Sequence, residues 1–84
     1  MKQEIREFIF KNYLIGGEEK DLNDKDSFLE KGIIDSTGIL ELVMFIEENY
    51  NIEVEDEEVI PDNLDSVQKV CDYIEKKVHQ GTFW

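Results

Sequence analysis

The stretch "DSTGILELVMFIEENY", Asp35 to Tyr50, combines a helix start signal with an apolar repeat of helical period. Either Asp35 or Ser36 can cap a helix that begins here, because both residue types accept hydrogen bonds from free backbone N–H groups. At about 100° per residue, one side of this helix collects a full core stripe: Ile39, Leu42, Val43, Ile46 and Tyr50. The sequence therefore predicts an amphipathic helix that ends near Tyr50.

The opposite side of this helix is acidic, yet it also holds two large apolar residues. Its members are Thr37, Leu40, Glu41, Met44, Glu47 and Glu48. One interpretation is that Leu40 and Met44 pack under a neighbouring loop. The other is a docking face, because apolar anchors inside a polar rim are typical of transient protein contacts and methionine adapts to several partners.

Helical periodicity also marks both ends of the chain. The N-terminal pattern predicts a helix over Lys2–Leu14, with apolar residues at Ile5, Phe8, Ile9 and Tyr13. Near the C-terminus, Asp65 is expected to cap the last helix, with Gln68 as its capping-box partner. The apolar stripe of that helix is Val67, Val70, Cys71, Ile74 and Val78. This pattern places Cys71 in the core rather than in a reactive site.

Between these helices the chain is mostly polar. The long connection that reaches about Lys31 is expected to be pinned to the core by Phe28, Leu29, Ile33 and Ile34. A short helical turn is expected over Asp56–Ile60, stopped by Pro61. The predicted fold class is therefore all-α, a small four-helix bundle of three longer helices and one short third helix. Residues 1–80 form a single domain, and residues 81–84 are a C-terminal tail without an assigned role.

Charge restricts the partners of this 84-residue chain, whose net charge is −12. From Gly32 to Gln68 there are eleven acidic residues and no basic one. Such a field repels nucleic acid and anionic membranes and attracts basic protein surfaces. Glu4 and Glu7 interrupt what would have to be the apolar part of a signal peptide, and the longest apolar run is far too short for a membrane span. We expect a cytoplasmic, monomeric domain.

Two site chemistries can be tested against the residue pattern. The segment "DLNDKDSFLEKG", from Asp21, fails as a calcium loop because it has Lys25 at loop position 5 and Gly32 where a glutamate must ligate. The single cysteine excludes an internal disulfide and a cysteine-based zinc site. No metal ligand is therefore assigned.

Ser36 lacks the surroundings of a catalytic serine. A nucleophile needs a base within hydrogen-bond reach and an oxyanion hole, but the only histidine, His79, lies near the C-terminal end. We therefore predict no catalytic activity. Ser36 is either a plain helix cap or a site at which another enzyme attaches a phosphorylated group, which a helix N-terminus stabilises.

The residues from Asp35 to Val59, "DSTGILELVMFIEENYNIEVEDEEV", resemble the Asp-Ser-Leu attachment site, recognition helix and acidic third segment of acyl carrier proteins. The segment "SVQKVCDYIEKK" resembles the last helix of that family. The resemblance implies a 4'-phosphopantetheine arm, derived from coenzyme A and attached to Ser36. The arm would hold an acyl or aminoacyl group as a thioester and deliver it to enzymes of fatty acid, polyketide or secondary metabolism.

The same resemblance implies roles for other residues. The partner-docking set is Asp35, Thr37, Leu40, Glu41, Met44, Glu47 and Glu48, and the acyl-groove candidates are Ile46, Val54 and Val59. The implied partners are a phosphopantetheinyl transferase and adenylating ligases or synthases with basic docking patches.

Two features depart from the family pattern. Directly after the serine, where the family usually has leucine or another large apolar residue, this chain has Thr37, followed by Gly38. The segment "IPDNLDS" is also slightly longer than in housekeeping carriers. Both point to a specialised rather than a housekeeping member. The residues alone leave one alternative open, an acidic helical adaptor that binds a basic protein without any prosthetic group.

Overall fold

The computed structural model describes residues 1–81 and contains only helical regular structure in that range. The elements are α1 (Lys2–Asn12), the 3₁₀ turn η1 (Glu19–Asp21), α2 (Ser36–Tyr50), the 3₁₀ turn η2 (Asp56–Glu58), α3 (Pro61–Leu64) and α4 (Val67–Gly81). The predicted class, three longer helices and one short third helix, is confirmed. Helix α4 includes Gly81, and the rest of the expected tail, residues 82–84, lies outside the described residues.

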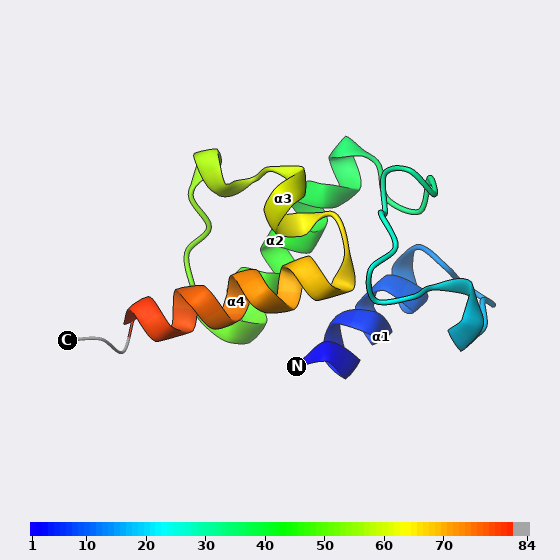
Figure 1. The fold of residues 1–84 in the computed structure, drawn as a ribbon, viewed down its shortest axis with the longest axis horizontal. Coiled ribbons are helices and arrows are strands. Elements are labelled where there is room, and N and C mark those ends of the chain that lie inside the picture. Colours follow the sequence, from blue (N-terminus) through cyan, green and yellow to red (C-terminus); the bar gives the residue numbers. More distant parts are fainter. Residues whose placement is uncertain (82–84) are drawn as a thin grey trace.

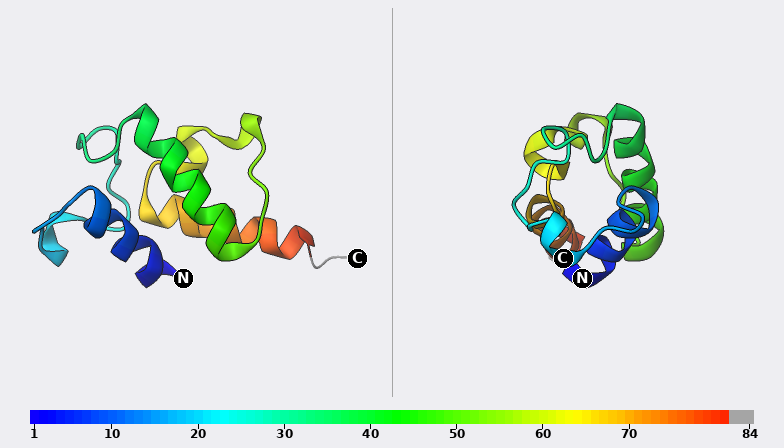
Figure 2. Two further views of the ribbon diagram at one scale, coloured as in Figure 1. Left: turned by 180° about the vertical axis from the view of Figure 1, so that it is seen from behind. Right: turned by 90° about the vertical axis from the view of Figure 1, so that its right-hand side faces the viewer.

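The helices enclose one core (Figures 1 and 2). Helix α3 packs on α4, and α1 also lies against α4. Helix α2 crosses behind α3 and α4 in Figure 1 and lies in front of them in the reverse view of Figure 2. Within the described residues, no helix is long and apolar enough to cross a lipid bilayer.

Most of the core is built from the predicted apolar stripes. Leu42, Ile46 and Ile74 are fully buried, and Cys71 is buried as expected, which raises the pKa of its thiol. Val78 was predicted in the stripe of α4 but is 41% exposed. Tyr73 was not in that stripe but is buried, because its ring lies in the core while its hydroxyl reaches Glu58.

The long connection between α1 and α2 is held in place by buried apolar residues and also by polar contacts that the apolar pattern does not reveal. Arg6, on α1, is only 8% exposed and forms ion pairs with Glu19 at 2.6 Å and with Asp24 at 3.0 Å. Of the four apolar residues expected to pin this segment, Phe28 and Ile34 are buried and Ile33 is half-buried. Leu29 is 42% exposed, so that part of the prediction is wrong.

The start of α4 differs from the prediction. Its N-cap is Ser66, whose Oγ accepts the backbone N–H of Lys69 at 3.1 Å. Asp65 instead accepts hydrogen bonds from the hydroxyl of Ser27 and, at 3.0 Å, from the backbone N–H of Leu29. The predicted capping box of Asp65 and Gln68 is therefore wrong, because the aspartate is used to hold a distant loop.

The third helix also differs from the prediction. The expected turn over Asp56–Ile60 is present only as η2, and Pro61 does not stop a helix but begins α3. Proline is favoured at the first helical position because its fixed φ suits the helix and its missing N–H would have had no helical partner there.

Each of the three tyrosines in the chain donates a hydrogen bond to a glutamate of another element. Burial is the larger cause and the hydrogen bond to the glutamate the second cause of a raised pKa at each tyrosine. Together they raise the pKa values of Tyr13 and Tyr50 to about 12 and also raise the pKa of Tyr73. Because these folded-state values exceed the ordinary value of about 10, the stabilisation is complete below pH 10 and is lost as the pH rises through about 12.

We therefore expect the tyrosine titration of the folded protein to be delayed. Near-ultraviolet absorbance of tyrosinate should stay low at about pH 10, whereas the chain unfolded in urea should be about half ionised there. Half-ionisation of the folded protein at that pH would contradict the three hydrogen bonds.

Candidate functional site

The first turn of α2 presents Ser36 to solvent because its neighbour performs the capping. The Oδ1 atom of Asp35 accepts the backbone N–H of Gly38 at 2.8 Å, which makes Asp35 the N-cap and Ser36 the first helical residue. Ser36 is exposed, and its hydroxyl makes no hydrogen bond to another described residue. The plain-cap interpretation of Ser36 is therefore not what the structure shows.

Gly38 lets two side chains pack tightly against this turn. A Cβ atom at Gly38 would lie 2.6 Å from Cγ2 of Ile34 and 3.2 Å from both Cε1 and the hydroxyl oxygen of Tyr13. The same tyrosine hydroxyl donates to Glu41 at 2.5 Å. The absence of a side chain at Gly38 therefore permits close packing at the start of α2.

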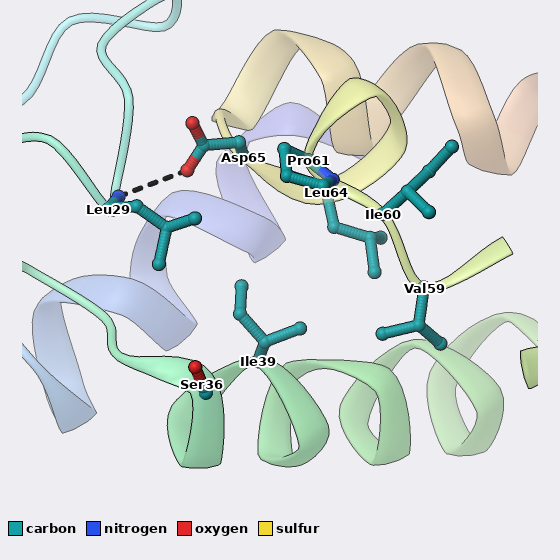
Figure 3. A pocket seen from close by; sticks show the side chains of 8 residues that line it. All are labelled: Leu29, Ser36, Ile39, Val59, Ile60, Pro61, Leu64 and Asp65. Carbon is teal, nitrogen blue, oxygen red and sulfur yellow. Dashed lines mark hydrogen bonds between the residues drawn. The ribbon is translucent and has the colours of Figure 1, made fainter. Parts of the chain in front are cut away.

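An apolar cavity of about 220 Å³ opens beside Ser36. Figure 3 shows Ser36 and Leu29 near one end and Val59 at the other, with α2 on one side and α3 opposite. Its lining residues are Leu29, Ser36, Ile39, Val59, Ile60, Pro61, Leu64 and Asp65. The hydroxyl is thus the polar end of a space with mostly apolar walls.

The three predicted acyl-groove residues do not share this cavity. Val59 lines it, but Ile46 is fully buried in the core and Val54 is half-buried against the core. Sequence reasoning missed Leu29, Ile39 and the segment 60–64, because these walls come from three separate parts of the chain. One signal available in the sequence was Leu29, an apolar residue in a mostly polar connection.

The predicted docking residues lie mostly on the exposed side of α2. Leu40 and Met44 are 58% and 59% exposed, so they do not pack under a loop. Asp35, Thr37, Glu41 and Glu48 are exposed as well. Glu47 differs, because it is half-buried and its Oε2 accepts the backbone N–H of Val54 at 3.0 Å.

The geometry offers no support for a serine hydrolase. His79 lies in the last turns of α4, and that end of the helix is at the opposite end of the molecule from the start of α2 (Figures 1 and 2). A base at that position cannot take the proton of Ser36, which would require hydrogen-bond distance.

Comparison with known proteins identifies the family. The chain is 38% identical over 77 residues to an acyl carrier protein of Buchnera aphidicola subsp. Acyrthosiphon pisum, which covers 92% of this chain and 91% of the relative. The chain belongs to the acyl carrier protein family. An acyl carrier protein of Buchnera aphidicola subsp. Schizaphis graminum is 48% identical over 59 residues, 70% of this chain and 71% of the relative. No family sequence model matches the chain.

The fold agrees with this assignment. A crystal structure of an acyl carrier protein from Thermotoga maritima has a TM-score of 0.65 and 23% identity, covering 94% of this chain and 92% of that chain. Acyl carrier proteins are carriers that interact with enzymes and are not catalysts themselves. The predicted family and carrier role are confirmed, which favours the carrier over the adaptor alternative.

Replacing the glycine at the first turn of this carrier tests the close packing seen there. In an ordinary helix, glycine to alanine stabilises by about 0.8–1.0 kcal/mol. Overpacking a filled site costs about 1–3 kcal/mol. Because the added methyl would meet the buried, β-branched Ile34, we expect Gly38→Ala to lower the free energy of unfolding by a net of up to about 2 kcal/mol, measured by urea denaturation.

Thr37→Ala is the matched control, since Thr37 is exposed in the same turn. It should leave stability unchanged or slightly raised, because alanine has the higher helix propensity. If Gly38→Ala raised the free energy of unfolding as much as Thr37→Ala does, the first turn of α2 would not be tightly packed.

Proposed function

We propose that this acyl carrier protein bears a 4'-phosphopantetheine arm, joined to Ser36 by a phosphodiester, whose thiol holds acyl groups as thioesters. The observation that carries the proposal is the exposed Ser36 hydroxyl at the first position of α2, with Asp35 performing the capping. If the Ser36 hydroxyl capped the helix, its modification would break a hydrogen bond to the helix backbone. Because Asp35 is the cap, modification of Ser36 breaks no such bond.

The surroundings of Ser36 fit a phosphate-linked group. Free backbone N–H groups and the positive end of the helix dipole favour negative charge at the start of α2. Within the described residues, the carboxylate of Asp35 accepts a hydrogen bond only through Oδ1, which leaves Oδ2 available to a transferase or to the metal ion of that enzyme.

The cavity beside Ser36 has the size and the apolar walls to hold a small apolar group. Its volume of about 220 Å³ lies below the range of about 300–1,000 Å³ typical of sites for drug-sized ligands. Apolar side chains from the loop, α2 and α3 form most of its wall, so burial of a short acyl chain there releases water from apolar surface. Val59, the one predicted groove residue in this wall, keeps its proposed role.

The exposed side of α2 is the proposed docking face for partner enzymes. Leu40 and Met44 supply apolar anchors, and Glu41 and Glu48 supply the acidic rim. Partners of this chemistry are a phosphopantetheinyl transferase and loading ligases or synthases with basic patches. Glu47 belongs to this face only weakly, because its carboxylate holds Val54. The small, polar Thr37 at the edge of the face is one of the two features that favour a specialised carrier, beside the long segment "IPDNLDS".

Intact mass spectrometry tests the attachment. Incubation with coenzyme A and a permissive phosphopantetheinyl transferase should add the mass of one arm to the wild-type protein and nothing to Ser36→Ala. Thr37→Ala retains Ser36 and should still be modified. A gain in mass by Ser36→Ala, or no gain by the wild type with any such transferase, would refute the assignment.

Charge reversal tests the docking face. Glu48→Lys should reduce the kcat/KM of modification about threefold at low salt, mainly through slower association, because exposed charge pairs contribute about 0.2–1 kcal/mol. The deficit should shrink at 1 M salt, where the screening length falls to about 3 Å.

Glu75→Lys is the matched control, since Glu75 is an exposed residue of α4 and undergoes the same charge change. Its effect should be clearly smaller than that of Glu48→Lys. Equal deficits for the two variants, or a deficit that does not change with salt, would argue against docking by charge on α2.

A further inference from the structure

A second surface lies between α1 and α2, away from the cavity beside Ser36. One depression of about 250 Å³ is lined by Phe8 and Asn12 of α1 and by Glu41, Met44, Phe45 and Glu48 of α2. A second, of about 410 Å³, is lined by Glu4, Glu7, Phe8, Lys11, Asn12, Phe45 and Asn49. The two depressions share Phe8, Asn12 and Phe45, and together they form what we call the α1–α2 groove.

Aromatic rings form the floor of the α1–α2 groove. The rings of Phe8 and Phe45 stack with centroids 4.3 Å apart, and both side chains are half-buried. Tyr13 contacts Phe8 edge-on at 6.0 Å, and Tyr50 contacts Phe45 edge-on at 6.5 Å. Of these four rings, only Phe8 and Phe45 line the depressions, so this pair gives the floor its rigid apolar area, and each ring of the pair contacts one tyrosine edge-on.

Hydrogen bonds close both ends of the groove. Tyr13, just after α1, donates to Glu41 near the start of α2. Tyr50, at the end of α2, donates to Glu4 near the start of α1 at 3.1 Å. The two helices are thus antiparallel and tied at both ends, so the groove is formed before any partner binds.

The rim of the groove is anionic. Among its described lining residues, four are acidic, namely Glu4, Glu7, Glu41 and Glu48, and Lys11 is the single cation. A second copy of this chain, itself at −12, is repelled by such a rim, as are nucleic acids and anionic lipids. A cationic segment of another protein is attracted.

We propose that the α1–α2 groove binds a segment of a partner enzyme that places one large aromatic side chain on the Phe8–Phe45 pair and lysine or arginine side chains against the glutamates. This inference rests on the proposed docking face, because Met44 belongs to both surfaces, and it extends that face from α2 onto α1. Aromatic stacking supplies an anchor, and the charged rim supplies orientation and association rate.

Peptide binding to the full-length isotope-labelled protein, followed by NMR, tests the proposal. The probe is the capped peptide Arg-Lys-Trp-Arg-Lys, and its matched control has alanine in place of tryptophan. The tryptophan peptide should bind at least about fivefold more tightly, as expected for about 1 kcal/mol from one stacked anchor. It should also shift the amide signals of Asn12, Phe45 and Asn49. Equal affinity for the two peptides, or shifts confined to residues outside both helices, would overturn the proposal.

A pair of variants separates the groove from overall charge. Asn12→Lys adds one positive charge inside the groove, at a residue outside the predicted docking set, and Glu75→Gln makes the same net change on α4. Asn12→Lys should weaken binding of the tryptophan peptide about two- to fivefold, and Glu75→Gln should do so clearly less. Equal weakening would mean binding by charge alone and would overturn the proposal.

The outcome is distinguishable from that of the attachment test. If the peptide does not bind in the α1–α2 groove, the wild-type protein should still gain the mass of one arm at Ser36, because the two are measured separately. Failure of the attachment leaves peptide binding and the α1 amide shifts unaffected.

Discussion

The carboxylate of Asp65 positions the part of the molecule around Ser36. It accepts hydrogen bonds from the Ser27 hydroxyl and the Leu29 N–H, while its backbone carbonyl accepts the N–H of Phe28. Bonds to a charged acceptor contribute about 1.5–3 kcal/mol each, and Asp65 is only 9% exposed. Because Asp65 lies between α3 and α4, these bonds fix the long connection relative to both helices. They place Phe28 in the core and Leu29 in the cavity wall.

Helix α2 combines several roles within 15 residues, because helical period sends neighbouring residues to different sides. Leu42 and Ile46 are buried in the core, Ile39 faces the cavity, and Met44 is exposed. The stacked ring of Phe45 joins the helix to α1. Helix α2 thus presents the proposed attachment residue, one wall of the cavity and the proposed docking face on a single element.

Signals between residues close in sequence were enough to predict much of this protein. Periodicity identified α1, α2 and α4 and most of the core, and the aspartate-serine pair located the start of α2. These predictions succeeded because helical faces and the cap of α2 depend on residues within a few positions of one another. The charge distribution predicts protein partners of opposite charge, and this interpretation stays a prediction. The same local view failed at Pro61 and Asp65, whose surroundings are set by distant segments.

The sequence by itself therefore determined the all-α class, the main helices and the residue that bears the candidate attachment hydroxyl. Only the tertiary structure decided which side chains line the cavity, that Asp35 caps α2 while Ser36 stays exposed, and that Glu47 is engaged by Val54. It also created the α1–α2 groove from rings 37 positions apart, Phe8 and Phe45. The physical reason is that these features depend on contacts between residues far apart in the chain, which helical period and composition do not encode.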